Sequence, residues 1–137
     1  MATTPVLERA DLRGRDRAAT RGLPYNRADA LWALGLALLV VATRLPFRTR
    51  MLFNWDSANF ALALSQFDVS QHRPHPPGYP YFVAVAKGLH LLGLDPNTSL
   101  VLVALLLSAG AASALYLLGR AVYGPAVGVV ASLFLVF

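Results

Sequence analysis

Residues 99–118, SLVLVALLLSAGAASALYLL, contain no charged side chain and no proline. About 20 apolar residues in an α-helix cover the roughly 30 Å hydrocarbon core of a bilayer. Small residues are concentrated in the second half of this stretch and would let another helix approach closely: Ser108, Gly110, Ala111, Ala112, Ser113 and Ala114. The stretch therefore predicts a membrane-spanning helix within an all-α bundle.

The composition of the whole chain agrees with this class. Of the 137 residues, 56% are hydrophobic and 14% are charged, with a mean hydropathy of +0.52, which is too apolar for an ordinary soluble domain. The net charge of +5 comes largely from arginines in the first 27 residues, which suit anionic lipid headgroups better than nucleic acid. There is no cysteine, so disulfides and thiolate chemistry are excluded. We expect an integral membrane protein that binds membrane lipid and no nucleic acid.

Other apolar runs extend the bundle on both sides of this helix. We predict a disordered basic tail over residues 1–29 and the N-terminal part of a transmembrane domain over residues 30–137. The expected spans are about 30–47, 80–94, 99–118 and 125–137, with a polar turn from Asp95 to Thr98 between the second and the third. The last run is unbroken at Phe137, so we expect the chain to be the N-terminal piece of a larger polytopic protein.

The arginines also indicate an orientation. Six of them precede the uncharged apolar run of residues 30–43, and Arg44, Arg48, Arg50 and Arg73 lie between this run and the second one. This excess places the N-terminus in the cytoplasm, at the plasma membrane, and the loop of residues 48–79 outside. With four successive spans, the turn at residues 95–98 would return to the cytoplasm.

The expected exterior loop carries a helical pattern over residues 55–67. Asp56, Asn59 and Gln66 form a polar face while apolar side chains cover the rest, as in a helix that lies along the membrane plane. The run His75-Pro76-Pro77-Gly78-Tyr79-Pro80-Tyr81 follows. Its prolines exclude a helix, its glycine permits a turn, and the last proline suits the first turn of a new helix. Its tyrosines suit a bilayer interface.

Together, the basic tail, the single span, the loop that opens with Asp56-Ser57-Ala58-Asn59-Phe60 and the proline-rich run resemble the start of polytopic glycosyltransferases of the GT-C fold. The chain looks most similar to the protein O-mannosyltransferase and aminoarabinose-transferase-like branch, which includes uncharacterised bacterial members. The resemblance covers about residues 30–124. Many members have an Asp-Glu pair and a tyrosine three residues further on, where this chain has Asp56-Ser57 and Phe60, so the acceptor class stays open.

The resemblance implies an enzyme that transfers a sugar, with inversion, from a polyprenyl-phosphate donor to an acceptor on the exterior face. Asp56 matches the catalytic aspartate of the family's first exterior loop and would act as general base. We expect substrate to be bound by Asn59, Arg73, His75 and Tyr79. No cofactor is predicted. No metal site is predicted, because prolines surround His72 and His75 and no nearby carboxylate completes a ligand set, and whether the enzyme needs a divalent metal is left open.

Each candidate has a structural alternative. Asp56 precedes a helical pattern and could be only its N-cap. Lys87 and His90 lie in the second expected span, where they would be functional or would reach the cytoplasmic interface. The alternative class of function is a non-catalytic membrane protein, either a transporter or an assembly protein that binds polyprenyl lipid. A transporter should carry polar groups near the middle of broken helices.

Overall fold

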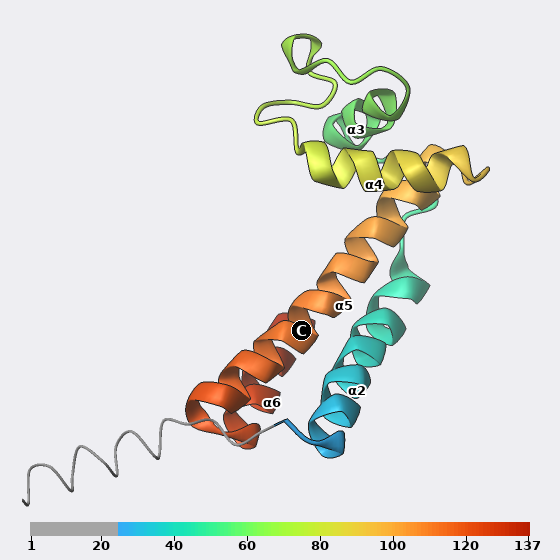
Figure 1. Ribbon diagram of the computed structural model, residues 1–137. Coiled ribbons are helices and arrows are strands. Elements are labelled where there is room, and N and C mark those ends of the chain that lie inside the picture. The colour runs from blue at the N-terminus through green and yellow to red at the C-terminus, as the bar shows by residue number, and fades with distance from the viewer. Residues whose placement is uncertain (1–24) are drawn as a thin grey trace, which may run out of the picture. The chain divides into compact units, whose positions relative to one another are not determined.

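The computed structural model describes residues 25–137, and in that part of the chain the secondary structure is helical apart from one isolated β-bridge (Figure 1). The predicted all-α class is confirmed. Most of the predicted tail lies outside the described residues, but Asp29 already belongs to the first helix. The helices are α2 (Arg27–Arg44), η1 (Leu45–Phe47), α3 (Trp55–Ser65), η2 (Val69–Gln71), α4 (Pro80–Leu91), α5 (Pro96–Tyr123) and α6 (Pro125–Val136).

Two helices of the described part are long and apolar enough to cross a membrane. One is α2 with η1, 21 residues in all, and the other is α5, with 28. Both expose large apolar side chains: Leu31, Leu34, Leu38, Leu106, Leu107 and Leu118 are all more than half exposed. Apolar surface of this extent is rare on soluble monomers. A bundle of four spans and its orientation stay predictions.

Helix α5 begins and ends differently from the prediction. Asp95 is not part of a free turn, because its Oδ1 accepts a hydrogen bond of 3.0 Å from the Thr98 amide and caps the helix, with Pro96 as the first helical residue. An Asp-Pro pair favours a turn and a helix start equally well. At the other end, the helix continues through Gly119 to Tyr123, and Gly124, with a φ of +106°, separates it from α6. The predicted span of residues 99–118 is therefore extended at both ends.

The helix in the predicted second span is shorter than expected, because it ends at Leu91. Helix α4 has 12 residues, about 18 Å of helix, which is shorter than a bilayer core. Asn97 Nδ2 donates a hydrogen bond of 2.9 Å to Thr49 O, so the start of α5 lies beside the end of the first apolar helix. Residues 49 and 97 therefore lie close together, and the side of the membrane on which residues 95–98 lie stays a prediction.

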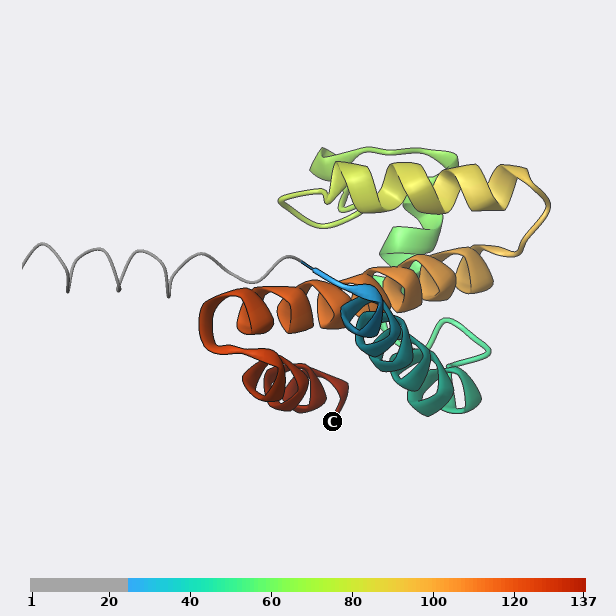
Figure 2. The ribbon, with the colours of Figure 1, turned by 60° about the horizontal axis from the view of Figure 1, so that its bottom comes forward.

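Residues 49–95 thus form one connecting module, which contains α3, η2 and α4. Helices α3 and α4 pack against each other, as both ribbon views show (Figures 1 and 2). Lys87 and His90 belong to α4 of this module, and their place in a membrane span stays a prediction. The Nδ1 of His90 makes a hydrogen bond of 2.7 Å with Leu94 O and closes the end of α4.

The chain divides into two compact units. In the unit of residues 37–111, α3, α4 and the first turns of α5 share an apolar core made of Ala63, Leu64, Val83, Ala86, Leu100 and Val103. In the unit that contains residues 25–36 and 112–137, α6 lies beside the C-terminal part of α5 (Figure 2). Only glycine fits at position 128 there, because a Cβ would approach Tyr116 O to 2.5 Å.

The second of these units also holds a buried ion pair. Arg120 Nε donates to Asp29 Oδ1, and the Tyr116 hydroxyl donates to the same oxygen at 3.0 Å. Asp29 Oδ2 accepts from the Asn26 amide at 2.7 Å, while Asn26 Oδ1 accepts from the Asp29 amide at 3.0 Å. These last two bonds form a capping box at the start of α2. Both oxygens of the buried carboxylate are therefore occupied.

Candidate functional site

The first turn of α3 places Asp56. Asn54, not Asp56, caps this helix: Asn54 Oδ1 accepts from the Ser57 amide at 2.8 Å, and the Asn54 amide donates to Ser57 Oγ at 3.1 Å. The interpretation of Asp56 as the N-cap is therefore wrong. The carboxylate of Asp56 is 63% exposed and is not used in closing the helix.

The proline-rich run carries His75 back to this carboxylate. The preceding loop is closed by paired backbone hydrogen bonds of 2.8 and 2.9 Å between Asp68 and Arg73. The hydroxyl of Ser70 and nearby amides hold the pKa of Asp68 below its usual range, so the carboxylate stays charged in this loop. His75 Nδ1 then lies 3.5 Å from Asp56 Oδ1. This Nδ1 is buried and makes no hydrogen bond.

Aromatic rings surround the imidazole. The rings of Phe60 and Tyr79 each lie 5.6 Å from that of His75 and 5.6 Å from each other. Phe82 adds a fourth ring, 5.5 Å from Phe60. Tyr79 has a φ of +46° where α4 begins, and Pro80 follows as the first residue of that helix. Gly78 allows this turn, because a Cβ there would lie 2.7 Å from the side chain of Val69.

A pocket of about 430 Å³ adjoins these rings. It is mainly apolar, and polar groups reach it from Ser57, from the end of the first apolar helix and from the start of α5. Its lining consists of Thr49, Ser57, Phe60, Tyr79, Phe82, Asn97, Leu100, Val101 and Ala104. We call it the aromatic pocket. Rings on one side with a few polar groups beside them are typical of a small-molecule site.

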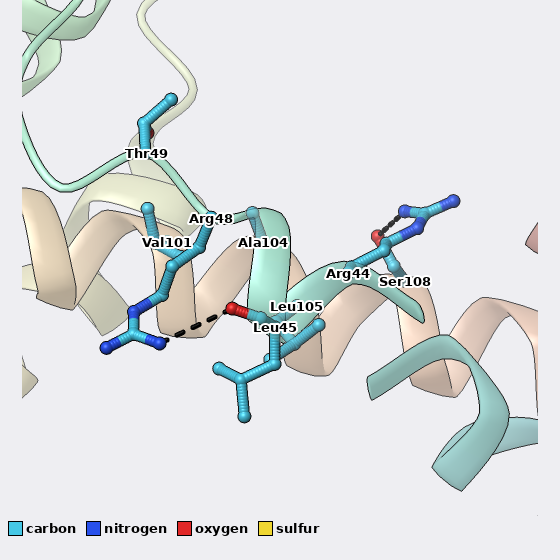
Figure 3. A pocket seen from close by; sticks show the side chains of 8 residues that line it. All are labelled: Arg44, Leu45, Arg48, Thr49, Val101, Ala104, Leu105 and Ser108. Atoms are coloured by element: carbon cyan, nitrogen blue, oxygen red, sulfur yellow. Dashed lines mark hydrogen bonds between the residues drawn. The ribbon is translucent and has the colours of Figure 1, made fainter. Parts of the chain in front are cut away.

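A second pocket, of about 210 Å³, shares Thr49, Val101 and Ala104 with the aromatic pocket (Figure 3). Its other lining residues are Arg44, Leu45, Arg48, Leu105 and Ser108. We call it the arginine pocket. Arg44 Nη1 donates to Ser108 Oγ at 2.8 Å, and Arg48 Nη1 donates to Leu45 O at 3.3 Å. Two arginines four residues apart at the end of an apolar helix are a signal that the sequence carries, but only the orientation was predicted from them.

No family model, curated protein or solved structure matches this chain. What the site can do must therefore be derived from its side chains alone.

The expected site residues separate into two groups. Asp56, His75 and Tyr79 lie together, with Phe60 between the helices. Arg73 is held elsewhere, because its Nη1 donates to Gln66 Oε1 at 3.1 Å. Asn59 is 94% buried, and its Nδ2 has no hydrogen-bond partner. His72 ends the η2 turn with a φ of +58°.

The arrangement supports proton transfer beside an apolar pocket. An exposed carboxylate accepts a proton from a hydroxyl that reaches hydrogen-bonding distance. An imidazole nitrogen 3.5 Å away can orient that carboxylate after a small shift. The aromatic faces next to it offer a stacking surface for the apolar face of a ring-shaped ligand.

Proposed function

We propose that the protein is a membrane glycosyltransferase, which moves a sugar from a polyprenyl-phosphate donor to an acceptor on the exterior face. In this proposal Asp56 is the general base, and the aromatic pocket receives the sugar. Membrane association is supported by two helices of suitable length and composition. The observation that carries the proposal is the Asp56–His75 pair, which lies beside the aromatic pocket and has no part in capping α3.

The proposed reaction needs one proton acceptor and one leaving group. Asp56 takes the proton of an acceptor hydroxyl as its oxygen attacks the anomeric carbon of the sugar. The bond between that carbon and the phosphate oxygen breaks, and polyprenyl phosphate leaves with the bonding electrons. Attack from the side opposite the phosphate inverts the anomeric configuration. A positioned general base contributes about 10²–10⁴ in rate to such a step.

His75 has a supporting role in this scheme. With the proton on Nδ1 the imidazole can donate toward Asp56 Oδ1 and fix the direction of the carboxylate. Phe60 and Tyr79 hold the imidazole through edge contacts. His75 therefore positions the base and does not itself take the proton.

The decisive variant is Asp56→Asn in the full-length protein. Asparagine keeps the size and polarity of the side chain but cannot accept the proton, so we expect transfer from a polyprenyl-phosphate sugar to fall at least about 10²-fold. Transfer is measured as release of polyprenyl phosphate in reconstituted membranes. Thermal unfolding of the variant should match that of the parent protein.

Asp95→Asn is the matched control. Asp95 caps α5, and asparagine is nearly as good an N-cap as aspartate, so this variant should fold and transfer sugar normally. Near-normal transfer by Asp56→Asn would remove Asp56 from the chemistry. Donor binding with no transfer by the parent protein would instead favour the non-catalytic lipid-binding alternative.

A further inference from the structure

The arginine pocket combines two features that seldom occur together by chance. Its floor is apolar, formed by Leu45, Val101, Ala104 and Leu105, and its two cationic side chains stand at opposite ends of that floor (Figure 3). None of the residues of the described chain that line it is acidic. A positive rim over an apolar floor matches an amphiphile with an anionic head.

The geometry points to a binding site for the phosphate of a membrane lipid between Arg44 and Arg48. Guanidinium groups bind phosphate oxygens through paired, charge-assisted hydrogen bonds. Both side chains are exposed and long enough to turn toward a shared anion, and the hydroxyls of Thr49 and Ser108 add donors in the same pocket. Basic pockets between membrane helices are known to hold lipid headgroups of this kind.

The position of the pocket along the chain fits a headgroup. Arg44 is the last residue of α2, and η1 ends three residues later at Phe47, so the arginines stand where the first apolar helix ends. A lipid phosphate lies at this level of a bilayer, while its hydrocarbon lies against the apolar part of the helices. Leu45 and Leu105 would contact the first carbons of the chain.

The adjoining aromatic pocket indicates which lipid the arginine pocket would select. Because Thr49, Val101 and Ala104 belong to both linings, a group attached to a phosphate in the arginine pocket enters the aromatic pocket without leaving protein contact. A sugar linked to polyprenyl phosphate has this arrangement, with its anomeric carbon next to the phosphate. The choice of a sugar donor rests on the proposed function, whereas the phosphate site does not. Arg73, which was expected among the substrate-binding residues, does not line either pocket.

Binding is tested with the full chain in detergent by native mass spectrometry. The probes are a long-chain polyprenyl phosphate, the uncharged polyprenol of equal length, phosphatidylglycerol and inorganic phosphate. We expect Arg44→Gln and Arg48→Gln each to weaken polyprenyl-phosphate binding about tenfold or more, as for loss of a hydrogen bond to a charged group. Polyprenol binding should not change.

Arg50→Gln is the matched control, because Arg50 follows in the same segment but does not line the pocket. It should leave binding within about twofold, whereas an equal loss in all three variants would mean a general attraction of surface charge and would overturn the proposal. Ser108→Ala removes the hydrogen bond to Arg44 and keeps the positive charge of Arg44. Arg44→Lys keeps a positive charge but removes the guanidinium group and its paired hydrogen bonds. If both variants keep part of the polyprenyl-phosphate binding and their helicity is unchanged, the lower affinity results from lost contacts and not from lost folding.

The lipid probes distinguish the sources of the phosphate. If the arginine variants weaken the binding of polyprenyl phosphate only, the result supports the site with a sugar donor as its ligand. If they weaken the binding of phosphatidylglycerol only, it supports the site with a bilayer lipid as its ligand. Equal binding of polyprenyl phosphate and polyprenol overturns the proposed phosphate site. So does a result in which the arginine variants weaken the binding of inorganic phosphate only. Asp56→Asn should bind polyprenyl phosphate normally. If the parent protein binds polyprenyl phosphate through these arginines but transfers no sugar, the result counts against the proposed function alone.

Discussion

Asp29 and Asp56 occupy nearly equivalent places in two different units of the molecule and have opposite surroundings. Each lies in the first turn of a helix, three and two residues after an asparagine. Asp29 is 96% buried, and its carboxylate receives hydrogen bonds from Asn26, Tyr116 and Arg120. The Asp56 side chain is 63% exposed, and its Oδ1 lies 3.5 Å from the Nδ1 of His75.

The difference shows how to separate structural from chemical carboxylates. A buried carboxylate whose two oxygens already accept hydrogen bonds from the protein is not accessible to a substrate, and removing it leaves a buried cation without this counter-charge. An exposed carboxylate beside a pocket, in a helix that another residue already caps, is dispensable for folding and available for proton transfer. We therefore expect Asp29 to govern stability and Asp56 to govern activity.

The largest expected effect on stability is that of Asp29→Ala. This change leaves the guanidinium of Arg120 buried without its partner, which costs about 3–5 kcal/mol for buried ion pairs. Denaturation followed by circular dichroism measures the loss. A cost below about 1 kcal/mol would mean that the two aspartates do not differ as proposed.

A double variant separates the charge from the packing. In Asp29→Leu with Arg120→Met both charges are gone and the volume is kept, so most of the lost stability should return, as is often found when a whole buried pair is replaced. Arg120→Met alone should be as harmful as Asp29→Ala. Equal losses in the single and double variants would assign the effect to packing around Tyr116.

A smaller effect is expected at the start of α3. Asn54→Ala removes both bonds of the capping box and should cost about 1 kcal/mol, the usual value of an N-cap. Asp56→Ala at high salt should cost less, because only its interaction with the helix dipole is lost and salt screens it. The same denaturation measurement compares the two. A larger loss of stability in Asp56→Ala than in Asn54→Ala would mean that Asp56 is the residue that caps α3.

The smallest expected effect on stability is at Asp68, a third aspartate, whose hydrogen bonds come from neighbouring residues and are exposed to solvent. Its pKa is lowered by the Ser70 hydroxyl and by backbone amides, so its contribution to stability is full above the ordinary carboxyl pKa of about 4 and is lost as the pH falls through the lowered value. The melting temperatures of the parent protein and Asp68→Asn should therefore differ at neutral pH and converge in acid. A difference that persists unchanged in acid would contradict this.

What could be predicted from the sequence follows from local patterns. An uncharged run predicts α5, and the polar-apolar pattern of residues 55–67 predicts α3, which ends at Ser65. The Asp-Pro pair at residues 95–96 was predicted to lie in a turn, but the same pair is equally suited to the start of a helix.

The remaining features depend on residues far apart in the chain. Arg120 meets Asp29 across 91 positions, and Arg44 meets Ser108 across 64, which no periodicity reveals. Asp56 and His75 were both expected at the site, but their 3.5 Å separation requires the Asp68–Arg73 bridge and the turn at Gly78. The catalytic role of Asp56 stays a prediction.

The bond between Asn97 and Thr49 has a consequence for how such a protein can diversify. Because the two ends of the connecting module meet, the module leaves and re-enters the helical scaffold at one point. Replacing it by another segment, longer or shorter, changes the closure entropy only slowly with length and leaves the entry point where it was. The module can thus be exchanged for another segment while the apolar helices keep their sequence.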